Sequence, residues 1–296
     1  MPETPDVELY LHSLNQFIGG KVLNRVIVKS PFVLRTFAPT IEIAEKEKVT
    51  GFHRIGKRIV WEMESVNLVF HLMIAGRFHW KKAGKLPNGK RDLIAFQFEH
   101  GTMMMTEASK KKRAALHLVI KGGDLNQFDR GGIDPLKISL GEFSERLQLE
   151  NRTLKRALTD PRLFSGIGNA YSDEILLLAC LSPLKRTHQM KDNEIKRLFD
   201  ASQKTLSIWT KRLIAQTGDK FPEKVTAFRP EMMAHGKFEE KCAQCNKTTI
   251  RRIRYAENEC NYCPKCQCEG KILADRSLSR LLKGEWPKTI DELEQP

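Results

Sequence analysis

Six of the seven cysteines gather in one short stretch near the C-terminal end of the sequence. Cys242 and Cys245 form one Cys-x-x-Cys pair, and Cys263 and Cys266 form a second pair after 17 intervening residues. Two thiolate pairs at this spacing are typical of a zinc ribbon, in which four sulfurs complete a tetrahedral shell. A complete shell leaves no position for a reacting water. The sequence therefore predicts one structural Zn²⁺ ion.

The cysteine register has an open alternative, because Cys260-x-x-Cys263 has the same spacing. Six reduced cysteines without a metal are the other alternative. Disulfides are disfavoured, since the opening Met-Pro-Glu-Thr-Pro-Asp carries acid where an export signal needs basic residues.

A glycine-rich stretch, Ser165-Gly-Ile-Gly-Asn-Ala-Tyr-Ser-Asp-Glu, separates two segments of helical pattern. Two glycines one residue apart permit a tight turn that turns backbone N–H groups outward. Together with the N-terminus of the next helix, such a turn can bind an anion, and the Asn169 amide adds a donor. A plain turn between helices is the alternative.

The N-terminus offers a nucleophile if Met1 is removed, as is expected when the next residue is small. Pro2 would then carry a secondary amine, and an α-amine titrates near pH 8, about two units below a lysine. Glu3 follows directly as a proton donor. Met-Pro-Glu has no function in most proteins, so this pattern depends on its context.

The chain is strongly basic, with 50 Lys and Arg against 36 Asp and Glu and a formal net charge of +14. This excess favours a polyanionic partner, because each neutralised phosphate releases bound counterions. A merely soluble basic protein is the alternative. The sequence has neither a basic amphipathic helix nor an apolar run of roughly 18 residues, so we expect no membrane partner and a cytoplasmic location, on the nucleoid in a bacterium.

Hydrophobic periodicity predicts the elements that must position these residues. Residues 4–18 form a helix, with Thr4 as its cap and Gly19-Gly20 at its end. Segments 59–63, 67–72, 93–98 and 102–106 alternate as strands. After about residue 135 the period becomes helical, and apolar residues from Ile195 to Leu213 mark one long helix.

These patterns predict an α+β protein with an N-terminal β-sandwich or barrel-like domain, flanking helices and a C-terminal helical domain with a zinc finger. We expect four parts: an N-terminal domain (1–130), a helical domain (131–236), the zinc finger (237–272) and a C-terminal tail (273–296).

Five motifs in sequence order resemble those of the formamidopyrimidine-DNA glycosylase and endonuclease VIII family. The opening Met-Pro-Glu-Thr-Pro-Asp-Val-Glu is similar to its M-P-E-L-P-E-V-E, and Gly56-Lys57-Arg58 to its lysine motif. His71-Leu-Met-Ile-Ala-Gly resembles H-L-G-M-S-G, the stretch from Gly166 resembles G-I-G-N-I-Y-A-D-E, and Tyr262-Cys-Pro-Lys-Cys-Gln closes the finger. The resemblance covers the chain to about residue 272.

The resemblance implies a DNA glycosylase with AP lyase activity that acts in base-excision repair on damaged, duplex DNA, as a monomer. Pro2 would form a Schiff base with the sugar, Glu3 would protonate the ring oxygen, and Lys57 would bind phosphate and assist elimination. Asn169 would hold phosphates beside the lesion. The family fold is a β-sandwich joined to a helix–two-turns–helix domain with a zinc finger.

Several positions depart from the family pattern. Met73 and Ile74 stand in the first loop that fills the gap left by a flipped base, beside His71. The second such stretch has Lys111, a candidate phosphate contact, and no aromatic wedge. Arg91 replaces a frequent histidine. Asn258 stands where the family has a finger arginine, which predicts weakened δ-elimination.

Two other functions remain open at this stage. A protein of the same fold that binds DNA lesions with weak or no glycosylase activity is compatible with the missing arginine. A zinc-ribbon factor acting on RNA would explain the charge and the cysteines, but not Pro2, Lys57 and Asn169 together.

Overall fold

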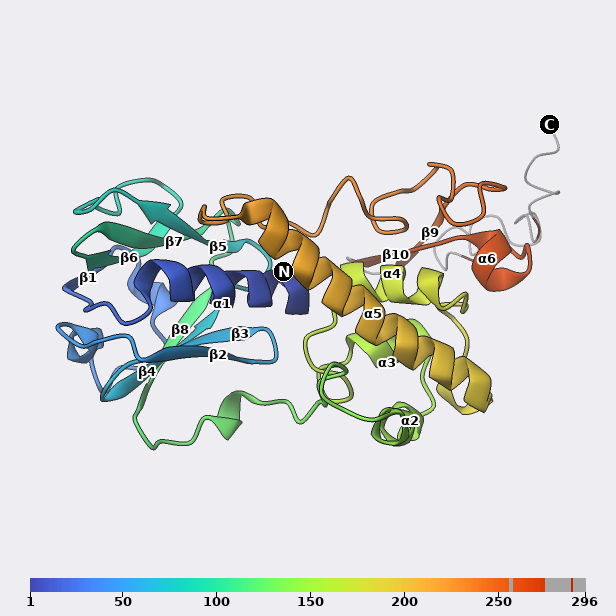
Figure 1. Cartoon of the computed structure of the whole chain (residues 1–296), viewed down its shortest axis with the longest axis horizontal. Coiled ribbons are helices and arrows are strands. Elements are labelled where there is room, and N and C mark those ends of the chain that lie inside the picture. Colours follow the sequence, from blue (N-terminus) through green and yellow to red (C-terminus); the bar gives the residue numbers. More distant parts are fainter. Residues whose placement is uncertain (256–257, 275–288, 290–296) are drawn as a thin grey trace. The chain divides into compact units, whose positions relative to one another are not determined.

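The computed structural model describes residues 1–255, 258–274 and 289, which form two compact units. The first unit contains residues 1–130 and 209–226, and the second contains the described parts of 131–208 and 227–296. Figure 1 shows the elements of both units. The expected four-part division remains a prediction.

Two four-stranded antiparallel sheets make up most of the first unit. One sheet has the order β1 (Arg25–Val28), β6 (Asp92–Phe98), β7 (Gly101–Glu107) and β5 (Gly76–Lys81). The other has the order β2 (Gly51–Ile55), β3 (Arg58–Glu62), β4 (Val66–His71) and β8 (Ala115–Ile120). The four predicted strands correspond to β3, β4, β6 and β7.

Aromatic side chains from both sheets form the core of this unit. The ring of Trp61 on β3 lies 5.0 Å from that of Phe96 on β6 and 5.7 Å from that of Phe78 on β5, measured between centroids. Phe70 on β4 contacts the same two rings. All four side chains are fully buried. The two sheets therefore face each other across a common core, which confirms the predicted β-sandwich.

Helix α1 (Thr4–Ile18) packs on the sandwich, where Tyr10 meets Phe78 edge-on at 5.6 Å. The prediction that Thr4 is the N-cap of this helix is wrong. Glu3 is the N-cap, because its side chain accepts from the backbone of Asp6 while the Asp6 carboxylate accepts from the Glu3 N–H. This reciprocal pair satisfies two N–H groups that a helix start leaves unpaired.

Helices dominate the second unit, together with one hairpin. Its elements are α2 (Leu140–Gln148), α3 (Leu154–Thr159), α4 (Asn169–Leu178), β9 (Arg251–Tyr255), β10 (Asn258–Tyr262) and α6 (Pro264–Cys268). The predicted long helix is α5 (Asp192–Thr217), which runs from the second unit into the first at Trp209. Short 3₁₀ turns cover Pro31–Val33, Ile41–Ala44, Asn126–Phe128 and Thr187–Gln189.

A small core joins α4 to the cysteine-rich segment. Leu177 packs with Ala234, Ile250 and two of the cysteines. None of the described helices is long and apolar enough to cross a membrane.

Candidate functional site

The N-terminal residues lie in a buried, charged environment in the first unit. Pro2 and Glu3 are both buried, and the capping box fixes the Glu3 carboxylate at the start of α1. Burial lowers the pKa of the terminal amine, here that of Met1, while the Glu3 carboxylate opposes the shift and Arg77 adds to it. A lowered pKa leaves more of the amine unprotonated at neutral pH.

Lys57 belongs to the same electrostatic environment. It follows Gly56, whose φ of +59° makes the tight turn between β2 and β3. Burial lowers the pKa of Lys57, and the carboxylates of Glu3 and Asp6 oppose that shift. The structure thus brings Lys57 within electrostatic range of Glu3, although 54 positions separate them in the sequence.

His71 lies at the end of β4 and completes this cluster. Burial, together with the positive charges of Arg58 and Lys57, lowers the pKa of His71 to about 4. The imidazole is therefore neutral at pH 7. It can donate or accept a hydrogen bond there without adding charge.

The other residues expected in the first unit lie in loops around the sandwich. Met73 has a φ of +53° and the neighbouring Ile74 is 62% exposed, in the turn between β4 and β5. Arg91 precedes β6, and Lys111 lies between β7 and β8; both are exposed. The buried Glu107 carboxylate accepts from two N–H groups at the end of the Lys111 loop and so fixes its base.

The glycine-rich stretch forms the tight turn that its sequence predicts. Gly166 has a φ of +83°, Gly168 is the N-cap of α4, and Asn169 is the first residue of that helix. Asn169 therefore stands in the N-terminal turn of α4, the end of a helix whose backbone N–H groups can bind an anion. Lys155 Nζ donates a hydrogen bond to the Asn169 carbonyl oxygen at 2.6 Å and so stabilises this turn.

A buried ionic network, which we did not predict from the sequence, supports the turn. Asp173 forms an ion pair of 2.5 Å with Lys155, and its other carboxylate oxygen lies 2.8 Å from His235 Nδ1. Asn261 Nδ2 donates to the same oxygen at 3.2 Å. Burial tends to raise the pKa of Asp173, but Lys155 and His235 bring it below its usual range.

The adjacent Glu174 ties the network to the segment that leads into the cysteines. Its carboxylate accepts from the N–H groups of Met233, Ala234 and His235 at 2.8–2.9 Å. Two acidic residues on a helix that is otherwise apolar were the available signal for this arrangement, because buried carboxylates require partners.

Four sulfurs gather as the cysteine spacing predicts. The Sγ atoms of Cys242, Cys245, Cys263 and Cys266 all lie within 4.8 Å of one another. Cys242 and Cys266 are 3.9 Å apart, and Cys245 and Cys263 are 3.7 Å apart. A tetrahedral zinc with Zn–S bonds of about 2.3 Å separates its sulfurs by about 3.8 Å. The four thiols therefore fit a metal ion of this kind, and Cys260 lies outside the set.

Asn258 begins β10, where its Cα pairs with that of Tyr255 across the hairpin. The neighbouring Glu257 and most of the tail fall outside the described residues.

Comparisons with known proteins agree along most of the chain. The formamidopyrimidine-DNA glycosylase N-terminal domain matches residues 1–126, and the H2TH domain of the same enzyme matches residues 132–214. A formamidopyrimidine-DNA glycosylase of Listeria monocytogenes is 27% identical over 277 residues, covering 90% of this chain and 100% of that protein. The Bacillus cereus protein of the same name is 29% identical over 276 residues, covering 90% and 99%.

Solved structures give the same result. A complex between wild-type Lactococcus lactis Fpg and DNA containing N7-benzyl-Fapy-dG has a TM-score of 0.78 at 25% identity, covering 90% of this chain and 100% of that one. Together with the sandwich, the helical domain and the four-cysteine cluster, these matches confirm the predicted α+β fold. The chain belongs to the formamidopyrimidine-DNA glycosylase family.

Proposed function

We propose that this protein is a DNA glycosylase of base-excision repair that also cleaves the abasic site through a Schiff base at Pro2. The family relationship and the DNA complexes of the Lactococcus lactis relative support glycosylase action on damaged DNA. The observation that carries the catalytic assignment is the burial of Pro2 and Glu3 at the start of α1, with Lys57 within electrostatic range of Glu3.

In this mechanism the Pro2 nitrogen attacks the sugar C1′ of the damaged nucleotide. The C1′–N bond to the enzyme forms as the glycosidic bond breaks, and the base leaves with the bonding electron pair and takes up the proton that the Pro2 nitrogen loses. Glu3 gives a proton to the ring oxygen, which opens the sugar and leaves an iminium ion. Loss of a C2′ proton then drives elimination of the 3′ phosphate, because the iminium accepts the electron pair.

The remaining predicted residues bind the DNA. Lys57 holds a phosphate next to the reacting sugar, with the neutral His71 beside it. Asn169 and the N–H groups at the start of α4 hold phosphates that flank the lesion, in a turn fixed by Lys155. Arg91 and Lys111 make further phosphate contacts from exposed loops.

Loop residues complete the lesion site. Met73 and Ile74 fill the space left by the flipped base; the exposure of Ile74 fits this role, since an inserted side chain must be accessible before DNA binds. Asn258 replaces the usual arginine, and its short neutral side chain gives weak δ-elimination. The four cysteines would hold one zinc ion, which supplies the rigidity of this module.

Borohydride reduction tests the nucleophile directly, because it converts the imine into a stable amine. We expect full-length protein to form a covalent complex with abasic duplex DNA, and peptide mapping to find the link at Pro2. A variant with an uncleaved N-terminal extension should not be trapped, since an acylated proline nitrogen has no available lone pair. Glu3→Gln should bind the same DNA but release base slowly.

Lys57 is the rival nucleophile, since burial lowers its pKa as well. Undiminished trapping of the extended protein, with the link at Lys57, would overturn the assignment to Pro2. Tight binding of abasic DNA without any trapping would instead identify a lesion-binding protein of the same fold.

A further inference from the structure

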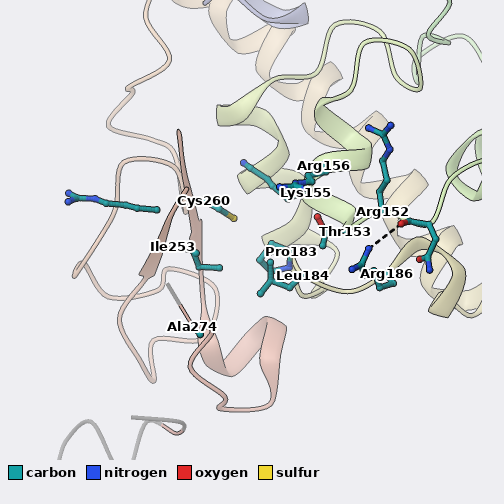
Figure 2. Close-up of a pocket in the computed structure, with 12 residues that line it drawn as sticks. Arg152, Thr153, Lys155, Arg156, Pro183, Leu184, Arg186, Ile253, Cys260 and Ala274 are labelled. Atoms are coloured by element: carbon teal, nitrogen blue, oxygen red, sulfur yellow. Dashed lines mark hydrogen bonds between the residues drawn. The ribbon is translucent and has the colours of Figure 1, made fainter. Parts of the chain in front are cut away.

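A pocket in the second unit contains none of the residues proposed to act on DNA. It lies between the start of α3, the segment after α4 and the β9–β10 hairpin, and its volume is about 440 Å³ (Figure 2). Pockets of about 300–1,000 Å³ are of the size that holds small ligands. Cys260 and Ile253 form its wall on the hairpin side.

The pocket is strongly basic. Four arginines line it, namely Arg152, Arg156, Arg186 and Arg254, and none of its described lining residues is acidic. Arg152 is neutralised by Glu150 and Asp160. Arg186 donates to the backbone carbonyl of Asn151, and it forms no ion pair among the residues that the structure describes.

Arg156 has the clearest role in binding. Its side chain is exposed, and it forms no ion pair with any residue that the structure describes. A concave surface with charges of one sign concentrates ions of the opposite sign. Guanidinium groups bind phosphate through paired N–H donors, so this pocket favours a phosphate group.

Apolar side chains line the pocket as well. Pro183, Leu184 and Ile253 line it, and Leu184 is 43% exposed despite its large hydrophobic side chain. Apolar side chains do not stabilise a bound phosphate. They do stabilise a bound nucleobase, because bases stack on apolar side chains and on guanidinium planes.

We propose that this pocket binds one nucleotide unit, with its phosphate on Arg156 and Arg186 and its base against Leu184 and Ile253. The pocket has room for a single nucleotide and none for a duplex, so the ligand is either a free mononucleotide or the unpaired end of a DNA strand. Lys155 does not bind it directly, since Asp173 and the Asn169 carbonyl already take its ammonium group.

Calorimetric titration of the full-length protein tests this site. Deoxyadenosine monophosphate should bind at least tenfold more tightly than either deoxyadenosine or inorganic phosphate. Arg156→Gln and Arg186→Gln should each weaken binding about tenfold, the usual effect of losing one charged hydrogen bond. Arg197→Gln is the matched control, because Arg197 is an exposed arginine on α5 outside the pocket, and it should bind like the unmodified protein.

One further ligand distinguishes a free nucleotide from the end of a DNA strand. Tighter, Arg156-dependent binding of a 5′-phosphorylated single-stranded oligonucleotide identifies a strand end, whereas preference for the monophosphate identifies a free nucleotide. Equal binding by Arg156→Gln, Arg186→Gln and the control overturns the site. Phosphate or deoxyadenosine binding as tightly as the monophosphate overturns its assignment to a nucleotide. None of these results depends on Pro2.

Discussion

His71 is neutral because it is largely buried and because several positive groups act on it. Burial is the largest cause of its lowered pKa, and Arg58, Lys57, His117 and Arg130 all act in the same direction. In the unfolded chain the same imidazole has a pKa near 6.5. Protonation of His71 therefore favours the unfolded chain, so this side chain makes the free energy of unfolding depend on pH.

The sign of this effect can be measured. Since the folded pKa is the lower one, the stabilisation is present above about pH 6.5 and is lost as the pH falls toward 4. The loss is at most about 3 kcal/mol, and solvent around the partly exposed ring reduces it. Urea unfolding of His71→Asn across this range should show a shallower decline than the unmodified protein. His12→Asn, at an exposed position on α1, should show the full decline.

At the scale of elements, the buried network of Asp173 joins α3, α4, the segment before the cysteines and β10. Each partner is almost fully buried, so the charges cannot be solvated if one is removed. A buried pair of this kind contributes little net stability while intact, but breaking it is costly. The network therefore fixes how the Asn169 turn and the hairpin pack within the second unit.

Asp173→Asn should lower the free energy of unfolding by about 3 kcal/mol, because Lys155 is left buried without its counter-ion. Lys155→Met combined with Asp173→Asn should recover part of this loss, since no buried charge remains. Asp200→Asn breaks the exposed Lys196–Asp200 pair on α5 and should cost less than about 0.5 kcal/mol. Equal stability of the two single variants in urea unfolding would contradict this account.

The cysteine cluster gives a second prediction at this scale. Purified protein should contain one zinc ion per chain, and chelation should lower the melting temperature, because the short β9–β10 hairpin has little core of its own. Metal analysis of Cys245→Ser should show that zinc is lost. Cys180→Ser should keep the metal, and so should Cys260→Ser; release of zinc from the latter variant would support the alternative register.

Local pattern explains which elements were predictable. The long helix α5, four strands and the cysteine cluster follow from periodicity or fixed spacing, which depend on neighbours in sequence. The Asp173 network was not predictable, because Asn261 lies 88 positions away from Asp173 and only the tertiary fold brings them together. The sequence pattern placed the N-cap of α1 one residue too late, because Thr4 is of the residue type preferred at that position. In the structure the N-cap is Glu3, which forms a reciprocal capping box with Asp6.

At the scale of the whole molecule, the net charge of +14 is spread over both units. Lys57, Arg91 and Lys111 belong to the first unit, while Arg251 and Lys265 belong to the second. Such a distribution favours many separate phosphate contacts over a single strong one. Most of the affinity for DNA should then come from release of counterions and should be independent of base sequence.

This origin of affinity predicts a steep dependence on salt. If about six phosphates are neutralised, affinity for abasic duplex DNA should fall roughly a thousandfold between 50 and 200 mM salt, measured by fluorescence anisotropy. Lys111→Gln should reduce the slope of log affinity against log salt by about one, because it removes one phosphate contact. Asn169→Ala should weaken binding at every salt concentration and leave the slope unchanged, since the amide it removes is neutral. If the affinity for DNA did not depend on salt, the positive charge would contribute to solubility and not to DNA binding. If Asn169→Ala bound DNA with unaltered affinity, the glycine-rich stretch would be only a turn between helices.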